Sequence, residues 1–253
     1  MLALTHAPSP NLEQCQRTYV APAPIAYGLA VRQHEAYCQM LRRSGADVRT
    51  LVVNPGLPDS VFIEDTAVVL DEVAVLASMG APSRRAEPAG IEPELRKYRE
   101  VERIEPPATV EGGDVLRVGR TLLAGLSSRT NAAGMGALRA IVRRFGYEVR
   151  PVPVRRCLHL KSACAALPDG RLLVNPAWLE VRALRGFALV RVPDPEPDAA
   201  NALLVGARVC LAAAHPRTAD LVRGLGFDVQ TIDLSEFAKA EGCVTCLSLL
   251  LSR

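Results

Sequence analysis

The chain has 253 residues, which is enough for one large domain or two small ones. Hydrophobic residues make up 49% of it and charged residues 23%, and this composition excludes a disordered tail, a collagen and a coiled coil. The net charge is +3, and no run of basic residues is longer than a pair such as Arg84-Arg85. Because nucleic-acid binders gather positive charge on one face, the even balance predicts no nucleic-acid partner and favours a small-molecule ligand.

The start of the chain and the cysteines indicate a cytoplasmic location. Residues 1–10 lack the regions of a signal peptide, and the uncharged stretches 18–31 and 242–252 are shorter than the ~20 residues that span a bilayer. Seven cysteines without a secretory signal favour reduced thiols over a disulfide framework. We therefore expect a cytoplasmic protein with no membrane partner.

A repeated pattern runs along the chain in segments 41–49, 142–150 and 222–230. Each segment has arginine at a helix end, then a glycine that takes the left-handed conformation, then a valine that opens a strand. Two weaker copies enter strands near Val101 and Leu189, so five strand entries follow one another at intervals of 40 to 53 residues. The glycines are Gly45, Gly146 and Gly226, and the valines are Val48, Val149 and Val229.

Helices and short apolar runs alternate between these points. Thr130 is the predicted N-cap of a helix that runs to Gly146, and Pro216 opens another helix. The resulting strand–strand–helix–strand unit predicts an α/β repeat architecture. No linker rich in Pro, Gly or Ser divides the chain, so we expect one domain, 1–253. The apolar runs are 61–70, 115–123, 158–167, 203–211 and 244–250.

Polar residues inside these apolar runs are candidate site residues, because burying a polar group is costly unless it is paired or used. Five such positions lie at the front of the five strand pairs, which would let them converge on one axis of the molecule. They are Asp59 with Glu64 and Asp65, Glu111 with Asp114, His159 between two leucines, Asp198 with Asn201, and Cys243 with Cys246.

Each of these positions also has a structural explanation. A histidine between leucines is often a buried core residue, and acidic residues before a strand often form a solvated turn. The Cys243-x-x-Cys246 motif resembles a redox pair, but redox pairs normally head a helix and this one heads an apolar strand. With Cys157 and His159, the two cysteines could instead bind zinc.

The same residues also fit a catalytic site. An ionised thiol is a strong nucleophile, and a histidine beside it carries protons when a carboxylate such as Glu111 orients the ring. Further carboxylates near a thiolate are repulsive unless the substrate is a cation, and paired carboxylate oxygens match the planar fork of a guanidinium. Arginines such as Arg84 and Arg129 would then hold a substrate carboxylate, so the expected ligand is similar to arginine.

Six motifs carry a resemblance to a known family, and the match as a whole covers roughly residues 25 to 253. They are PDSVFIED at 58–65, GAPSRR at 80–85, TVEGGD at 109–114, GLSSRTN at 125–131, LHLK at 158–161 and VTCLSL at 244–249. This set resembles the dimethylarginine dimethylaminohydrolases of the guanidine-modifying (pentein) superfamily. The resemblance implies an α/β fold, a five-bladed propeller of ββαβ units with pseudo-fivefold symmetry, in agreement with the five strand entries.

The resemblance also implies an activity and the residues that carry it. The implied reaction converts asymmetric dimethylarginine or monomethylarginine to citrulline plus dimethylamine or methylamine, through a covalent S-alkylthiouronium and without a metal or organic cofactor. The implied roles are Cys246 as nucleophile, His159 as general acid and base, Glu111 as its supporting carboxylate, Asp59, Glu64 and Asp65 for the guanidinium and amino ends, Arg84 and Arg129 for the substrate carboxylate, and Ala240 for a backbone contact. The family's N-terminal lid falls between about Asn11 and Pro24, where the match is poor, and no lid residue is assigned.

Two other functions stay open at this point. Another pentein activity, such as that of an arginine deiminase, would use the same nucleophile and differ in how the pocket treats the methyl groups. A non-catalytic protein that binds zinc or arginine is an alternative from a different class, and in an enzyme, zinc captured by Cys246 and His159 would inhibit. An exposed strand edge would allow a homodimer.

Overall fold

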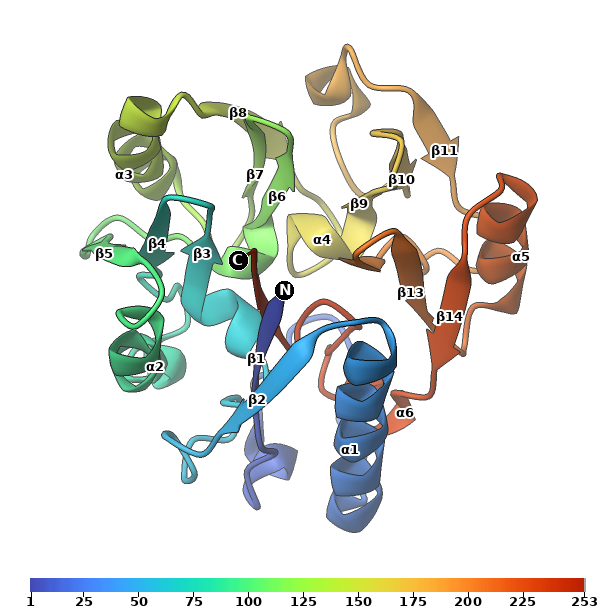
Figure 1. The fold of residues 1–253 in the computed structure, drawn as a ribbon, viewed down its shortest axis with the longest axis horizontal. Helices are drawn as coiled ribbons and strands as arrows, with labels where there is room; N and C mark the ends of the chain where they lie inside the picture. Colours follow the sequence, from blue (N-terminus) through green and yellow to red (C-terminus); the bar gives the residue numbers. More distant parts are fainter. Residues whose placement is uncertain (253) are drawn as a thin grey trace.

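The computed structural model describes residues 1–252 and arranges five three-stranded sheets in a ring (Figure 1). Each sheet has the same pairing, in which the first and second strands are antiparallel and the second and third are parallel. A parallel pair needs a crossover connection, and here a helix fills it in each unit. The five sheets, with strands in spatial order, are β15-β1-β2, β3-β4-β5, β6-β7-β8, β9-β10-β11 and β12-β13-β14.

The bounds of the elements are as follows. The strands are β1 Leu2–His6, β2 Asp47–Leu51, β3 Ala67–Val69, β4 Val73–Leu76, β5 Glu100–Arg103, β6 Val115–Val118, β7 Thr121–Leu126, β8 Glu148–Pro153, β9 Cys164–Ala166, β10 Leu172–Val174, β11 Leu189–Arg191, β12 Leu203–Val205, β13 Arg208–Ala212, β14 Val229–Ile232 and β15 Leu249–Leu251. The helices are α1 Tyr27–Arg43, α2 Glu87–Leu95, α3 Ala132–Val142, α4 Leu160–Ala163, α5 Pro216–Gly224 and α6 Ser235–Ala238. Short 3₁₀ helices include Ile63–Thr66, Gly112–Asp114 and Val181–Leu184, and the last of these makes the crossover from β10 to β11.

The five predicted strand entries are confirmed. They correspond to the third strands of the five units, β2, β5, β8, β11 and β14, each of which begins within one residue of the predicted position. The three helix-stopping glycines all have positive φ, between 76° and 92°. The ring of five ββαβ units is therefore the five-bladed α/β propeller that the sequence predicts.

The apolar core is divided around the ring. Five buried clusters lie between neighbouring sheets, and each contains residues of the two sheets that it joins together with residues of the adjoining helices and loops. One cluster, for example, packs Leu2 and Leu4 of β1 against Ala74 and Leu76 of β4. Because apolar packing takes place between the sheets, polar side chains can occupy the axis.

The loops that lead into the first strands differ from the expectation. The apolar runs 61–70 and 158–167 each begin with a helical turn, Ile63–Thr66 and α4, and only their last residues form the strands β3 and β9. In the run 244–250, turns occupy the first residues, and β15 begins only at Leu249. In the first two runs, three consecutive polar or small residues (64–66 and 161–163) form a helical turn instead of extending the strand.

The predicted N-cap of α3 is one residue off. The Oδ1 atom of Asn131 accepts the N–H of Gly134 at 2.7 Å, so Asn131 is the N-cap. The Thr130 hydroxyl instead accepts the backbone N–H of Glu111 at 3.1 Å. Pro216 opens α5 as predicted.

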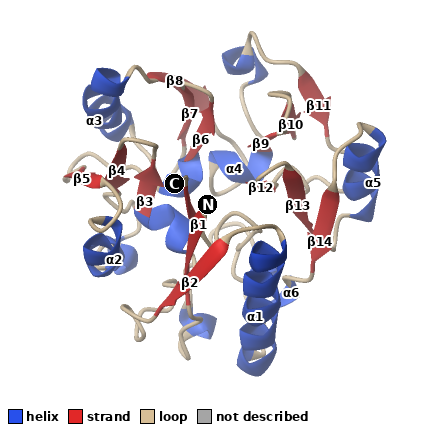
Figure 2. Cartoon of the chain, in the orientation of Figure 1, coloured by secondary structure: helices blue, strands red, loops and turns tan. Residues whose placement is uncertain are grey.

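The ring closes between the two ends of the described chain. β15 pairs antiparallel with β1, joining Leu2 to Leu251 and Leu4 to Leu249, near the centre of the view (Figure 1). Helices α1, α2, α3 and α5 lie at the periphery, whereas α4 lies near the centre (Figure 2). None of the helices in residues 1–252 combines the length and the hydrophobicity needed to cross a membrane.

Candidate active site

The five predicted polar positions do converge on the axis. Each position has residues in the segment that leads into the first strand of its unit: Glu64 and Asp65 lie before β3, Glu111 and Asp114 before β6, His159 before α4 and β9, Asn201 before β12, and Cys246, together with Thr245, before β15. Pseudo-symmetry therefore brings together residues that are far apart in the chain.

Hydrogen bonds link these segments from one unit to the next. The loop before β6 is joined to Asp65, α4 is joined to Asp114, and Asn201 bridges α4 and Thr245, which in turn reaches Glu64. The bonds are Gly113 N to Asp65 Oδ1 at 3.2 Å, Leu160 N to Asp114 Oδ1 at 2.9 Å, Asn201 Nδ2 to Lys161 O at 2.9 Å and to Thr245 Oγ1 at 3.0 Å, and Thr245 Oγ1 to Glu64 Oε2 at 2.6 Å.

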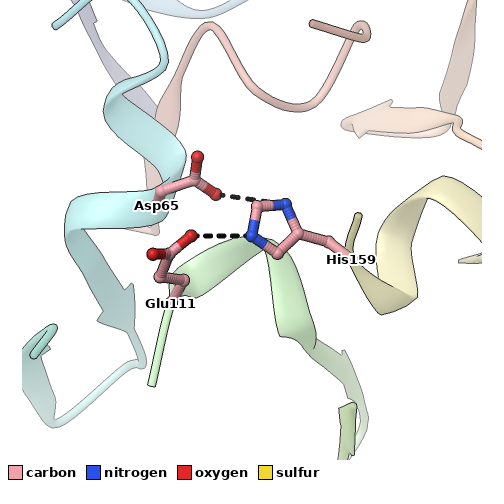
Figure 3. A group of neighbouring side chains, drawn as sticks. All are labelled: Asp65, Glu111 and His159. Carbon is pink, nitrogen blue, oxygen red and sulfur yellow. Dashed lines mark hydrogen bonds and ion pairs between the residues drawn. The ribbon is translucent and has the colours of Figure 1, made fainter. Parts of the chain in front are cut away.

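His159 lies between two carboxylates (Figure 3). Its Nε2 atom is 2.8 Å from Glu111 Oε2, and its Nδ1 atom is 3.7 Å from Asp65 Oδ1. All three side chains are buried, with 5% or less of each exposed. The backbone of His159 is extended, and the residue lies directly before α4.

This environment fixes the protonation state of His159. Burial alone would lower the pKa of His159, but the charge of Asp65 and the hydrogen bond with Glu111 together raise it to about 9. Burial alone would raise the pKa of Glu111, but its hydrogen bond with His159 and the charges of His159, Arg84 and Arg129 hold it well below its ordinary value. At neutral pH, His159 is therefore an imidazolium that faces two carboxylates.

The double glycine of the TVEGGD motif makes room for this cluster. A Cβ atom on Gly113 would lie 2.7 Å from both Asp65 Oδ1 and His159 Nδ1, and one on Gly112 would lie 2.0 Å from the carbonyl oxygen of Glu64. The two glycines therefore let their backbone lie close to other residues of the site, which a side chain at either position would prevent.

Two buried arginines balance the carboxylates. Arg84 donates from Nη1 to Asp65 Oδ2 at 2.7 Å and from Nε and Nη2 to Glu87 at 2.8–3.2 Å, and it is 3% exposed. Arg129 contacts Glu111 through Nη1 at 3.3 Å. Within residues 1–252, the Nε and Nη2 atoms of Arg129 make no hydrogen bond, so Arg129 retains more donors for a ligand than Arg84.

The other predicted substrate contacts also have protein partners. Glu64 Oε1 accepts from Lys161 at 2.7 Å, on the opposite side of its carboxylate from Thr245. Asp59 is buried and accepts the backbone N–H of Gln16 at 3.1 Å, and burial raises the pKa of Asp59. Ala240 is buried directly after α6, next to the turn that carries the cysteines.

Cys246 lies in a turn that is tied to the carboxylate segment. The backbone N–H of Glu64 donates to the carbonyl of Cys246 at 3.1 Å, and the N–H of Cys243 donates to Cys246 Sγ at 3.3 Å. Hydrogen bonding by the Cys243 side chain, burial, and the negative charges of Glu64 and Asp65 hold the pKa of Cys246 well above its ordinary value. At neutral pH, Cys246 is therefore a neutral thiol.

Glu241 holds the segment where a lid is expected, a role that the motif analysis missed. Its Oε1 atom accepts the backbone N–H groups of Thr18, Tyr19 and Val20, at 2.7 Å for Thr18 and 2.8 Å for Val20. Glu241 has a φ of 61°, which is uncommon for a residue with a side chain. No local sequence pattern indicates these three contacts, because Glu241 and its partners lie more than 200 residues apart in the chain.

The zinc alternative requires a different set of neighbours. Among the described residues, the potential metal ligands that gather within 4.8 Å of one another are Asp65, Glu111 and His159. Cys157 is turned away from this group and donates its thiol to the carbonyl of His159 at 3.4 Å. The set formed by Cys157, His159 and the two turn cysteines is therefore not assembled, and the carboxylates that face His159 are already paired with arginines.

A family model and two known proteins with similar sequences carry related names. A family model described as "N,N dimethylarginine dimethylhydrolase, eukaryotic" matches residues 8–163. An N(G),N(G)-dimethylarginine dimethylaminohydrolase of Streptomyces coelicolor is 43% identical over 253 residues, which cover 98% of this chain and 96% of the relative. Its counterpart in Pseudomonas aeruginosa is 36% identical over 225 residues, which cover 88% of this chain and 89% of the relative.

Solved structures agree with the sequence matches. A cysteine-to-serine mutant of the Pseudomonas aeruginosa enzyme in complex with citrulline matches with a TM-score of 0.93, at 33% identity and with 98% of this chain and 97% of that chain covered. The N-terminal domain of the cyanobacterial arginine dihydrolase ArgZ shares the fold, with a TM-score of 0.84 at 21% identity and with 98% and 97% of the two chains covered.

The ring of five units with its polar axis is the pentein fold of the guanidine-modifying enzymes. Within that superfamily, the family model and the two relatives narrow the assignment. The chain belongs to the dimethylarginine dimethylaminohydrolase family.

Proposed function

We propose that this protein hydrolyses N-ω-methylated arginines to citrulline and dimethylamine or methylamine. The observation that carries the proposal is the buried imidazolium of His159 between Glu111 and Asp65, next to the segment that binds the Cys246 turn. The named relatives, one of them solved with citrulline bound, support the same reaction. The site residues and their roles are part of this proposal.

The substrate is proposed to bind by charge. Asp65, with Glu64 and Asp59, receives the guanidinium and amino groups, because carboxylate oxygens match the N–H fork of a guanidinium. Arg129 and Arg84 hold the carboxylate at the other end of the substrate, with a further contact from the backbone of Ala240. Arg129 is the stronger candidate for the carboxylate, because more of its donors are free of protein partners.

In the first half-reaction, substrate binding lowers the cost of ionising Cys246, since the guanidinium offsets the charges of Glu64 and Asp65. The thiol of Cys246 releases its proton to solvent, because His159 is already protonated. The resulting thiolate attacks the guanidinium carbon and forms a C–S bond, while the electron pair of the C=N double bond moves onto nitrogen. His159, which holds a proton at neutral pH, donates it to the leaving nitrogen. The C–N bond breaks, the amine departs with the electron pair, and an S-alkylthiouronium remains on Cys246.

In the second half-reaction, the now neutral His159 takes a proton from water. The resulting hydroxide attacks the thiouronium carbon to give a second tetrahedral adduct. Collapse of this adduct breaks the C–S bond, transfers the hydroxyl proton to the sulfur and releases citrulline. His159 is protonated again, so Glu111 and Asp65 stabilise the resting state and orient the ring through the cycle.

A citrulline assay with asymmetric dimethylarginine, monomethylarginine and arginine tests the proposal. We expect production of citrulline from both methylated substrates and a loss of at least ~10³-fold in Cys246→Ser, since the nucleophile is removed. Activity on arginine alone would favour the deiminase alternative and overturn the named reaction. Citrulline production that survives in Cys246→Ser would overturn the covalent mechanism.

We also propose that residues 1–253 form one catalytic domain that works in the cytoplasm, and that it can form a homodimer. The β1–β15 pairing that closes the ring supports one domain. The exposed residues of the third strands, such as those of β2 and β5, support pairing through a sheet edge. Light scattering after gel filtration tests the dimer, and a monomer at all concentrations would contradict it.

A further inference from the structure

Two cysteines lie close together at the proposed nucleophile, and the reaction uses only one of them. The N–H of Cys246 donates to the carbonyl of Cys243 at 3.2 Å, which closes a four-residue turn. Such a turn holds its first and last Cα atoms within about 7 Å of each other, which overlaps the range that a disulfide requires. The N–H of Cys243 also donates to Cys246 Sγ, 3.3 Å away, so the sulfur of Cys246 lies over the backbone of Cys243.

Cys243 is accessible in a way that most cysteines of this chain are not. Cys243 and Cys246 are partly exposed, while the other five, at 15, 38, 157, 164 and 210, are buried. Cys243 also lines a cavity of about 410 Å³, whose wall includes Leu158, Trp178, His215 and Glu241. Cys246, His159, Glu111 and Asp65 are not part of this wall, so Cys243 stands between the cavity and the nucleophile.

We propose that Cys243 and Cys246 form a disulfide when the protein meets a peroxide, and that this modification reversibly switches off the site. The inference deepens the proposed function, on which it rests, because the switched group is the proposed nucleophile. It assigns Cys243 as a redox partner, a role that the hydrolysis does not need.

The chemistry balances with hydrogen peroxide as the oxidant. The thiolate of Cys243 attacks one peroxide oxygen, forming an S–O bond and breaking the O–O bond, and hydroxide leaves. The sulfur of Cys246 then attacks the Cys243 sulfenic acid, forming the S–S bond and breaking the S–O bond. The two thiol protons go to the departing oxygens, so that two thiols and one peroxide give one disulfide and two waters. A dithiol reductant reverses the change by thiol–disulfide exchange.

Tryptic mapping reads the modification directly, whatever the activity of the protein. Cleavage after Lys239 leaves Cys243 and Cys246 on one peptide, 240–253, whereas Cys157 falls on the peptide 157–161. The full-length protein is titrated with hydrogen peroxide, its remaining thiols are alkylated, and it is digested. We expect the peptide 240–253 to lose two hydrogen atoms and to take up no alkylating reagent.

Citrulline production is measured on the same samples. We expect activity to fall in proportion to the crosslinked fraction and to return with dithiothreitol. Cys243→Ala keeps the backbone N–H that faces Cys246 and serves as the matched variant, with each protein normalised to its own unoxidised activity. In this variant we expect no crosslink and no loss of activity that dithiothreitol restores, because the sulfenic acid and the second sulfur that form the disulfide are no longer paired.

Three results would overturn the inference. They are a peptide 240–253 that keeps both free thiols after activity is lost, a crosslink that joins it to the peptide 157–161, or a reversible loss of equal size in Cys243→Ala. An unoxidised protein without hydrolase activity would count against the proposed function alone, since the peptide map would still report the disulfide.

Discussion

The cluster around His159 and the turn around Cys246 lie next to each other at the axis, yet they hold their titratable groups in opposite ways. In the cluster, every charge has a partner: His159 faces Glu111 and Asp65, and these carboxylates pair with Arg129 and Arg84. In the turn, the thiol of Cys246 is neutral, and the negative charges of Glu64 and Asp65 contribute to its raised pKa. The cluster is thus organised before a ligand arrives, whereas the turn depends on a cation to become reactive.

The difference shows how the site can favour a cationic substrate. A ligand without positive charge would meet a neutral thiol, which is a poor nucleophile. A bound guanidinium supplies positive charge beside the Cys246 turn. Substrate binding and ionisation of the thiol are therefore coupled at this turn, whereas the His159 cluster is already charged without a ligand. The following predictions test each region separately.

Glu111→Gln should have the largest effect, a loss of about 10²-fold or more in kcat/KM, because His159 loses its charged partner and its proton. His159 has a raised pKa, so its protonated form is present below about pH 9 and is lost above it. We expect the alkaline limb of the wild-type pH–rate profile near pH 9 and a shift to lower pH in the variant. Glu72→Gln, at an exposed ion pair with Arg120, is the control and should leave the profile unchanged.

The same pKa shift has a consequence for stability. His159 stabilises the folded state fully below its unfolded pKa of 6.5, and this contribution is lost as the pH rises through about 9. Denaturant unfolding of the wild type and of Glu111→Gln should therefore differ most near pH 6 and converge above pH 9. A difference that stays constant with pH would show that Glu111 acts on folding in some other way.

Gly113→Ala tests whether the cluster needs its spacing. The added methyl group would lie 2.7 Å from His159 Nδ1, so the ring must move, and a displacement of ~1 Å at a catalytic group can cost about 10²-fold in rate. Gly136→Ala in α3 is the matched control, since its Cβ meets no atom within 4 Å. Equal activity of the two variants would mean that the position of His159 is not critical.

The turn should respond to neighbouring charge, which alkylation of Cys246 can measure. Glu64→Gln removes one of the negative charges that raise the pKa of Cys246, so we expect the midpoint of the iodoacetamide pH–rate profile to fall by about one pH unit. The modified peptide identifies the residue by mass spectrometry. An unchanged midpoint in Glu64→Gln would assign the raised pKa to burial and to Cys243 instead.

Glu241→Gln should give the smallest effect, a rise of about fivefold in KM with little change in kcat, the equivalent of roughly 1 kcal/mol. The variant keeps an oxygen acceptor for the N–H groups of Thr18, Tyr19 and Val20 and loses only the charge. If the segment 18–20 does not cover the bound substrate, steady-state kinetics will show no change in KM.

The repeat and the convergence of the polar segments could be predicted from the sequence, because both depend on local patterns. A glycine with positive φ after basic residues marks each clear unit, and the polar residue before each first strand falls on the axis once the units are related by symmetry. Polar residues before the first strands therefore predict that these side chains meet at the axis, although the sequence gives no distances between them.

Other features could not be predicted, because they depend on contacts between distant segments. Asn131 and Thr130 are both good N-caps, and only the position of Glu111 shows that the Thr130 hydroxyl is used elsewhere. The sequence predicts that Arg84 holds a ligand carboxylate. Its ion pairs with Glu87 and Asp65 could not be predicted, because Asp65 and Arg84 come together only when the chain folds. Glu241 reaches across the whole sequence to Thr18, and no local pattern announces it.

Because β15 closes the ring, the complete fold can form only after this strand has been synthesised. Cys246 lies three residues before β15, and β15 completes the sheet of β1 and β2. During synthesis, the residues of the cluster (Asp65, Glu111 and His159) leave the ribosome before Cys246 does. The sheet of β1 and β2 is completed only after the other four units have emerged, when β15 becomes available. The proposed nucleophile therefore emerges together with the strand that closes the ring, so a chain that stops before β15 has the residues of the His159 cluster but no assembled Cys246 turn.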